Sequence, residues 1–160
     1  MAPSAFATLI RVLPLISSTA AFTCSIGQQF AMKSFQAPGI SPEKVHAVWH
    51  AWFSSYKFIV LLSAPMHLTT IASSLINMRY SALPAFWWAC CIIFVIGHAY
   101  PLEMGKRHFN ETAERWGKRK PQEARAWVDE FVEANGSRLV FVDLPGWLTV
   151  VTVVIVNLGL

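Results

Sequence analysis

The feature that most constrains the fold is a pair of long stretches without a charged side chain. Residues 58–76 and 80–102 contain no Asp, Glu, Lys or Arg. A helix needs roughly 20 apolar residues to cross the hydrocarbon core of a bilayer, which is about 30 Å thick. Each stretch is therefore long enough to span a membrane, and a short polar turn joins the two.

Two further apolar stretches lie near the ends of the chain. One covers residues 139–160 and contains Asp143, and the other covers residues 5–26 and contains Arg11 and Pro14. The latter has no basic segment before its apolar run, which favours a retained helix over a cleaved signal peptide. We predict an all-α integral membrane protein, a four-helix bundle that forms a single domain over residues 1–160, with spans at about 5–26, 50–76, 80–102 and 139–160.

Charged residues are concentrated in the segment 103–138, between the third and fourth predicted spans. It holds eight of the thirteen Lys and Arg residues and seven of the nine Asp and Glu residues. Because cytoplasmic loops carry an excess of Lys and Arg, we predict that this long polar loop is cytoplasmic and that both termini lie on the opposite side. We also predict that the membrane is the endoplasmic reticulum. Apolar residues at helical spacing within 109–116 and 124–131 predict two short amphipathic helices in the loop.

The overall composition excludes several classes of protein. Hydrophobic residues make up 54% of the chain, charged residues 14%, and the formal net charge is +4. So small a positive excess sets membrane orientation more often than it binds phosphate, so we predict a lipid bilayer as partner and no nucleic acid. Three cysteines, two of them adjacent, form neither a disulfide framework nor a zinc site. Asn110 and Asn135 each begin a glycosylation pattern, but a cytoplasmic loop would leave both unmodified.

Two histidines lie inside the predicted spans. His67 is at the middle of the second span, and His98 is on the loop side of the third. An ionisable side chain at membrane depth is costly, usually faces the bundle interior and marks a functional site. The alternative is a neutral histidine that hydrogen-bonds across the bundle and only holds helices together.

Aromatic side chains share helix faces with these two histidines. Stripes of this kind are more often core than binding site, but two stripes that each end in an intramembrane histidine predict a cavity that opens toward Glu103 and the long loop. The residues near one face are Trp49, Tyr56, Ser63 and His67 on the second span, and Trp87, Cys91, Phe94 and His98 on the third.

A metal is one interpretation of this histidine pair. His67 and His98, with a carboxylate such as Glu103, would suit iron or copper. A site without any bound cofactor is the alternative. A second pair, His46 and His50, is four residues apart, but two histidines at this spacing without an intervening Glu are a weak metal signal.

The arrangement of spans and one motif are similar to a known family. Four spans in 160 residues, the long loop before the last span, and Trp52-Phe53-Ser54-Ser55-Tyr56 followed by Pro65 resemble the fungal anthrone oxygenases. These are small membrane proteins encoded among polyketide biosynthetic enzymes. The resemblance covers the whole chain at the level of architecture. It implies a membrane-bound monooxygenase of secondary metabolite biosynthesis that acts on a lipophilic aromatic intermediate, with molecular oxygen as co-substrate.

The implied chemistry needs a base in an apolar cavity and hydrogen-bond donors for a developing enolate oxygen. An anthrone-like substrate has an acidic methylene group, and the anion formed from it is electron-rich enough to react with oxygen directly. We predict His98 as the base and His67 as a second base or enolate donor, with Tyr56 and Glu103 orienting them. The residues predicted to bind the substrate are Trp49, Trp52, Trp87 and Phe94.

Two other functions stay open. The stretch Arg107–Glu114 superficially resembles a polar cluster of the four-helix microsomal glutathione transferase and prostaglandin synthase family, although that family carries the cluster on its second helix. The other alternative is a non-catalytic scaffold subunit of a membrane assembly. A cavity lined by His67 and His98 would favour an enzyme over the scaffold.

Overall fold

The fold comes from a computed structural model that describes residues 4–98 and 121–159, with the side chains of 53–60, 121 and 122 left undescribed. These described residues form helices and no strands, which confirms the predicted all-α fold. The count of four membrane-spanning helices stays a prediction. The elements are α1 (Ala5–Ser34), α2 (Pro42–Tyr80), a helix at Ala85–His98, α4 (Pro121–Arg138), the π-helical turn η1 (Leu139–Asp143) and α5 (Leu144–Leu158).

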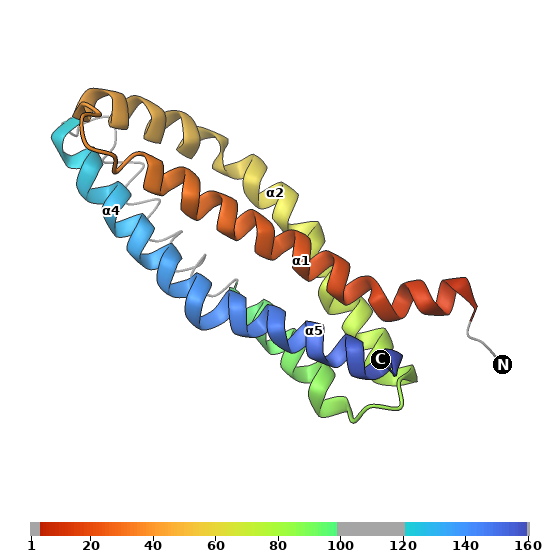
Figure 1. Cartoon of the computed structure of the whole chain (residues 1–160). Helices are drawn as coiled ribbons and strands as arrows, with labels where there is room; N and C mark the ends of the chain where they lie inside the picture. Colours follow the sequence, from red (N-terminus) through yellow and green to blue (C-terminus); the bar gives the residue numbers. More distant parts are fainter. Residues whose placement is uncertain (1–3, 99–120, 160) are drawn as a thin grey trace.

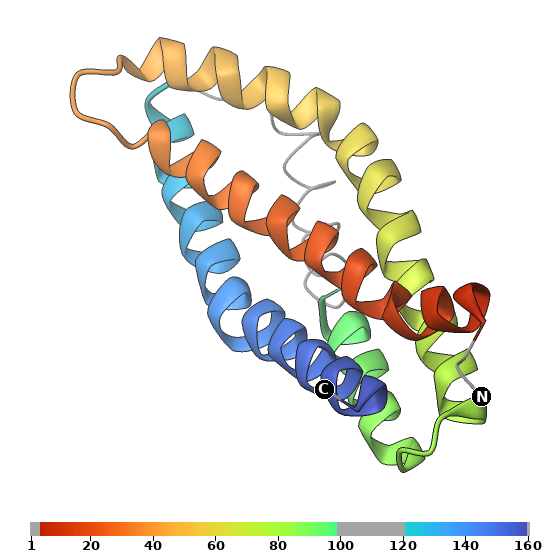
Figure 2. The ribbon, with the colours of Figure 1, turned by 45° about the vertical axis from the view of Figure 1, so that its right-hand side comes forward.

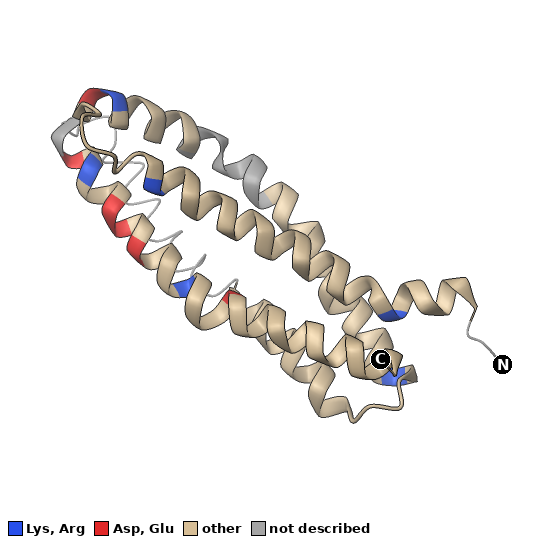
Figure 3. Ribbon diagram, viewed as in Figure 1, with Lys and Arg blue, Asp and Glu red and all other residues tan. Residues whose placement is uncertain are grey.

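The helices form an elongated bundle in which α1 packs against α2, α4 and α5 (Figure 1). The second view agrees that the α1–α2 connection and the start of α4 lie at one end, whereas both termini lie at the other (Figure 2). Most charged residues of the described chain gather at the former end, and few lie along the middle of the bundle (Figure 3). The apolar residues of the described chain therefore occupy the middle of the bundle and the end at which both termini lie.

Local signals fix where the long helices begin. The Ser4 hydroxyl accepts a hydrogen bond from the Ala7 N–H at the start of α1, and the Ser41 hydroxyl does the same for the Lys44 N–H at the start of α2. These N-caps satisfy amide groups that have no partner within the helix. Hydrogen bonds from the backbone and from Ser41 lower the pKa of the exposed Glu43 carboxyl in the first turn of α2.

The helices extend beyond the predicted spans, because caps and prolines set their ends rather than the limits of the apolar runs. α1 continues to Ser34, and α2 already begins at Pro42. The next helix begins only at Ala85, after Pro84, because a proline disfavours helical geometry in the residue before it. The predicted spans 5–26 and 50–76 are thus the apolar parts of longer helices.

The second half of the segment 103–138 is helical, as the amphipathic pattern at 124–131 predicted, but it is a longer helix than predicted and not part of a connecting loop. Residues 121–138 form α4, which continues through η1 into α5, so the chain is helical from Pro121 to Leu158. The reason is the amphipathic pattern predicted at 124–131, since Ala124, Val128 and Val132 bury an apolar stripe against α1 and α2. The pattern at 109–116 lies outside the described residues.

Many large apolar side chains are exposed on this bundle, and several polar side chains are buried between its helices. Among the described residues, twenty-one large apolar side chains are exposed, and nine polar or charged residues are buried. Several buried polar groups join helices: the hydroxyls of Ser17 on α1 and Thr70 on α2 are 2.7 Å apart, and the Asn77 amide donates to the Ile10 carbonyl at 2.9 Å. Small polar residues between helices and large apolar residues outside are typical of packing in lipid.

Two of the described helices are long and apolar enough to cross a membrane. They are Ala5–Ser34 and the continuous helix Glu123–Leu158, and only 17% and 22% of their most apolar windows are buried inside the protein. The buried core helix of a soluble protein would have most of that window covered. The helix Ala85–His98 is apolar but shorter.

Candidate functional site

A cavity of about 40 Å³ lies in the middle of the bundle, between α1, α2, the helix Ala85–His98 and the junction of η1 with α5. Its walls are mostly apolar, and it is partly open to the surface. A single water needs roughly 10–15 Å³ measured in this way, so the cavity holds only small molecules or one edge of a larger one. The ionisable and hydroxyl-bearing residues of its lining include Ser18, Ser25, His67, Thr70, His98 and Asp143.

His98 and Asp143 form a hydrogen-bonded pair at this cavity. His98 Nδ1 lies 2.6 Å from Asp143 Oδ1, and the two side chains are 13% and 4% exposed. An ionised carboxylate only accepts hydrogen bonds, so the proton of a neutral His98 ring is assigned to Nδ1, which donates to Asp143. The lone pair of Nε2 is then available as a base, as in hydrolases whose histidine is oriented by an aspartate.

His67 lies directly against this pair. The ring centroids of His67 and His98 are 4.3 Å apart, and the ring planes are tilted by 38°. The two predicted histidines therefore line one cavity, although they come from α2 and from the helix Ala85–His98. Two adjacent imidazoles can accept a proton at one ring while the other donates a hydrogen bond.

The π-helical turn η1 determines where Asp143 points. Pro145 has no N–H, and its ring would collide with the carbonyl of Phe141 in a regular α-helix. The helix widens instead, and the Leu144 N–H bonds to the Leu139 carbonyl five residues earlier. Single π-turns of this kind occur often at functional sites. Here the turn places the Asp143 side chain in the cavity wall beside His98.

Arg138 balances the charge of Asp143. Its Nε lies 3.4 Å from Asp143 Oδ2, and its side chain is 12% exposed. Asp143 thus lies between an imidazole and a guanidinium. The sequence analysis did not assign either residue to the site, because Arg138 closed the predicted polar loop. One sequence feature could have indicated this part of the site. Asp143 is a single acidic residue inside an otherwise apolar run, and Pro145 follows it two residues later.

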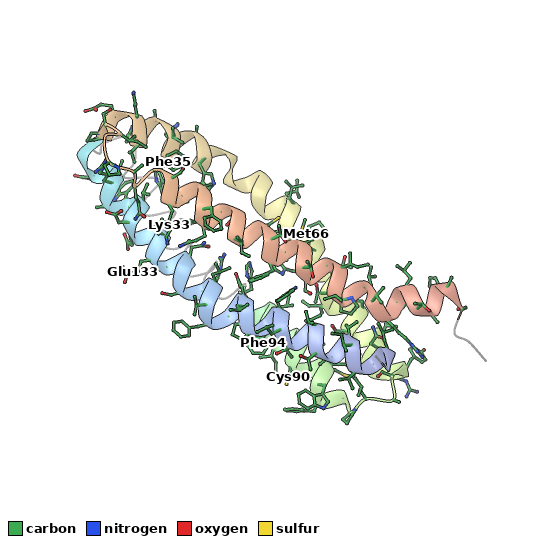
Figure 4. The ribbon with its side chains drawn as sticks, in the orientation of Figure 1. Lys33, Phe35, Met66, Cys90, Phe94 and Glu133 are labelled. Carbon is green, nitrogen blue, oxygen red and sulfur yellow. The ribbon has the colours of Figure 1, made fainter. Side chains whose placement is uncertain are left out.

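Aromatic side chains form one side of the cavity. The rings of Phe22 on α1 and Trp147 on α5 stack with centroids 5.3 Å apart, and the Trp147 indole donates to the Thr19 hydroxyl at 2.9 Å. Phe94, a predicted substrate-binding residue, also lines the cavity. It lies on the helix behind α5, whereas Glu133 is on the outer face of α4 (Figure 4).

The other predicted substrate-binding residues lie elsewhere. Trp49 and Trp52 stack on each other and contact Phe131 of α4 in a separate cluster. Trp49 precedes His67 by eighteen residues, or about 27 Å along a helix. The predicted aromatic face of α2 therefore extends from the cluster with α4, which contains Trp49, to the cavity, which contains His67. Trp87 is 47% exposed and does not line the cavity.

Two predicted orienting residues have no described position at the cavity. Tyr56 lies in α2, but its side chain is not described, and Glu103 lies outside the described residues. The cluster Arg107–Glu114, which suggested the glutathione transferase alternative, lies outside them as well. The roles predicted for Tyr56 and Glu103 stay predictions.

Iron or copper would find two imidazoles at this cavity. Within residues 4–98 and 121–159, no group of three His, Cys, Asp or Glu side chains could hold a metal ion. His67 and His98 are close together, but Nδ1 of His98 is already bonded to Asp143. A metal bound by this pair would take a further ligand from outside the described residues, and the metal stays a prediction.

Replacing Gly146 with alanine is expected to destabilise the protein by about 1–3 kcal/mol, the usual effect of overpacking. A Cβ atom at this position would lie 2.8 Å from Cβ of Phe94, so two helices would have to separate at the cavity. Gly27→Ala is the matched control, because Gly27 also lies in a helix and a Cβ there meets nothing within 4 Å. Unfolding by denaturant in micelles measures both variants. Equal stability of the two would contradict this packing.

Comparison of the chain with protein-family models, with curated proteins and with solved structures finds no match. The resemblance to the fungal anthrone oxygenases therefore stays a prediction.

Proposed function

We propose that the chain is an integral membrane enzyme that removes a carbon-bound proton from a lipophilic aromatic substrate and oxygenates the resulting anion. The observation that carries this proposal is the buried His98–Asp143 pair at a mostly apolar cavity. A general base has to be held in position and shielded from water to act on a weak carbon acid. The resemblance to the anthrone oxygenases supports the same reaction class.

The exposed surface supports the membrane part of the proposal. Large apolar side chains face outward: Leu61 is 68% exposed, Ile93 is 63% exposed and Phe141 is 76% exposed. Monomeric soluble proteins rarely leave large contiguous apolar surfaces in contact with water. A bilayer around the apolar part of the bundle would cover these side chains and bring lipophilic substrates to the protein.

The proposed reaction begins with proton transfer from a substrate methylene to Nε2 of His98. The electron pair of the broken C–H bond moves onto the substrate carbonyl as an enolate, and an N–H of neutral His67 can donate a hydrogen bond to it. The carbanion then attacks molecular oxygen, and the proton held by His98 completes a hydroperoxide. Loss of water leaves a ketone, so one oxygen atom enters the product and the other leaves as water.

The size of the cavity limits how a substrate could bind. Sites for small organic molecules usually enclose about 300–1,000 Å³, whereas this cavity has about 40 Å³. We infer that only the reacting edge of a flat substrate enters. The remaining rings would lie outside the cavity, and the stacked Phe22 and Trp147 of its lining offer them an aromatic surface.

Oxygen uptake in nanodiscs with an anthrone-type substrate tests the proposed function. The wild-type protein should consume oxygen faster than the uncatalysed autoxidation measured with empty nanodiscs, and one ketone should form for each oxygen molecule consumed. A wild-type rate equal to that background would contradict the assignment for this substrate class.

The fold and the proposed orientation both predict that Asn135 carries no glycan. This residue is 4% exposed, and both ends of its side-chain amide are hydrogen-bonded, so a sugar could not be attached in this fold. Protease added to sealed microsomes should cut within the segment 103–138, which is predicted to be cytoplasmic, and leave tags on both termini intact. A glycosidase-sensitive mass shift at Asn135, or loss of the terminal tags, would contradict the predicted cytoplasmic side.

A further inference from the structure

A continuous series of buried polar side chains leads from α1 to the His98–Asp143 pair. It begins with Gln29, which is 9% exposed. The Gln29 amide nitrogen donates to the Val132 carbonyl on α4 at 3.0 Å, and its oxygen accepts from Asn135 Nδ2 at 2.7 Å. Both ends of the Gln29 amide are therefore bonded to α4, which fixes the orientation of its oxygen.

Asn135 connects Gln29 to Arg138. Its side-chain oxygen accepts from an Arg138 terminal nitrogen at 2.6 Å, while its nitrogen donates to Gln29. The Arg138 guanidinium is thus held at one nitrogen by Asn135, and its Nε faces Asp143 Oδ2 at 3.4 Å. The order of contacts is Gln29, Asn135, Arg138, Asp143 and His98.

We propose that Gln29, Asn135 and Arg138 are positioning residues that hold the Asp143 carboxylate and thereby keep the His98 proton on Nδ1. The Nδ1–H tautomer requires that Asp143 stay ionised and aimed at this nitrogen. Arg138 supplies the charge that offsets the buried carboxylate, and the two amides fix the guanidinium against it. In water the Nε2–H tautomer of histidine predominates, so this chain would select the less common form, the one with a free Nε2.

The hydrogen-bonding pattern favours a positioning role for these residues over a role only in holding the helices together. Interhelical polar contacts often serve only to hold helices together. Each of Gln29 and Asn135 uses both its donor and its acceptor end, so the two amides are held in one orientation. Among the described residues, Arg138 Nε and Asp143 Oδ2 have no hydrogen-bond partner, and they meet as an ion pair at 3.4 Å. Because the members of a polar network are coupled, we expect a defect at either amide to displace the Arg138 guanidinium and, through it, the Asp143 carboxylate.

Gly136 allows this proposal to be tested at a distance from the cavity. A Cβ atom at position 136 would lie 2.9 Å from Nε2 of Gln29, so alanine must displace the Gln29 amide. The substitution leaves the side chains of Arg138, Asp143 and His98 unchanged. Gly27→Ala, where a Cβ meets nothing within 4 Å, is again the matched control on α1.

Nitrogen-15 NMR of the histidine rings tests the proposal in the full-length protein in nanodiscs. The wild type should show the Nδ1–H tautomer for His98, with a hydrogen-bonded ring proton, and Gly27→Ala should match it. Gly136→Ala and Asn135→Leu should give a mixture of tautomers. An unchanged His98 tautomer in folded Gly136→Ala, or an Nε2–H tautomer in the wild type, would overturn the proposal. Gly136→Ala, the milder change, decides the outcome if Asn135→Leu does not fold.

The same variants give a kinetic readout that rests on the proposed function. A misplaced base should lower kcat by up to about 100-fold, with little change in KM, because Gln29 and Asn135 do not line the cavity. Arg138→Lys, which keeps the charge, should retain more activity than Arg138→Met. A wild type without oxygenase activity would contradict the proposed function but leave the tautomer result intact, whereas equal kcat in all variants of an active enzyme would contradict the positioning role.

Discussion

Alanine at position 98 is expected to lower the oxygenation rate by roughly 10²–10⁴-fold, the usual contribution of a general base. His98 is the only residue of the described cavity lining that combines a ring nitrogen bonded to a carboxylate with a second ring nitrogen left available by that bond. The measurement is kcat for oxygen uptake in nanodiscs, after subtraction of substrate autoxidation. The fold should persist, because the remaining helix contacts at Trp88 and Cys91 do not involve His98.

His46→Ala is the control for this variant. His46 also lies on α2, but it precedes His67 by twenty-one residues, or about 30 Å along the helix. Its substitution should leave kcat close to the wild-type value. If His98→Ala matched an active wild type, the base would lie elsewhere, and His67 would become the candidate.

Leucine at position 143 is expected to destabilise the protein by about 3–5 kcal/mol, because it leaves the buried charge of Arg138 without its partner. Asp143 is 4% exposed and Arg138 is 12% exposed, so water can replace little of the lost interaction. The free energy of unfolding in mixed micelles measures the effect. Oxygenation should fall as well, because His98 loses the acceptor that orients it.

The double variant Asp143→Leu/Arg138→Met separates the charge effect from the loss of packing. Removing both charges leaves no unpaired ion, so the double variant should be more stable than Asp143→Leu alone. The two variants would be equally stable if Arg138 did not depend on Asp143, and that outcome would contradict the ion pair as described.

Helical periodicity was sufficient to predict which histidines meet. His67 and His98 are ionisable residues within apolar helices, and such residues usually face the interior of a helix bundle. Phe94 was found at the cavity for a related reason, since it lies one turn before His98 on the same helix. These positions follow from spacing within one helix.

The rest of the site depends on how different helices pack against one another, and the spacing of residues within one helix does not predict this packing. Asp143 and Arg138 meet because η1 adds a wide turn and because α4 continues into α5, whereas composition alone suggested a loop ending at 138. Trp49 shares a face with His67, but it packs with Trp52 against α4 near the charged end. Trp87 falls on an exposed surface, because aromatic residues in an apolar helix suit lipid as well as a binding site.

The most direct test of the central claim follows the substrate proton rather than oxygen. In anaerobic buffer made with deuterium oxide, the wild-type protein should exchange the methylene protons of an anthrone-type substrate faster than empty nanodiscs do, and His98→Ala should return the rate to that background. Mass spectrometry or proton NMR of the recovered substrate measures the exchange. Wild-type exchange no faster than background, or exchange that persists at the wild-type rate in folded His98→Ala, would contradict His98 as the group that removes the proton.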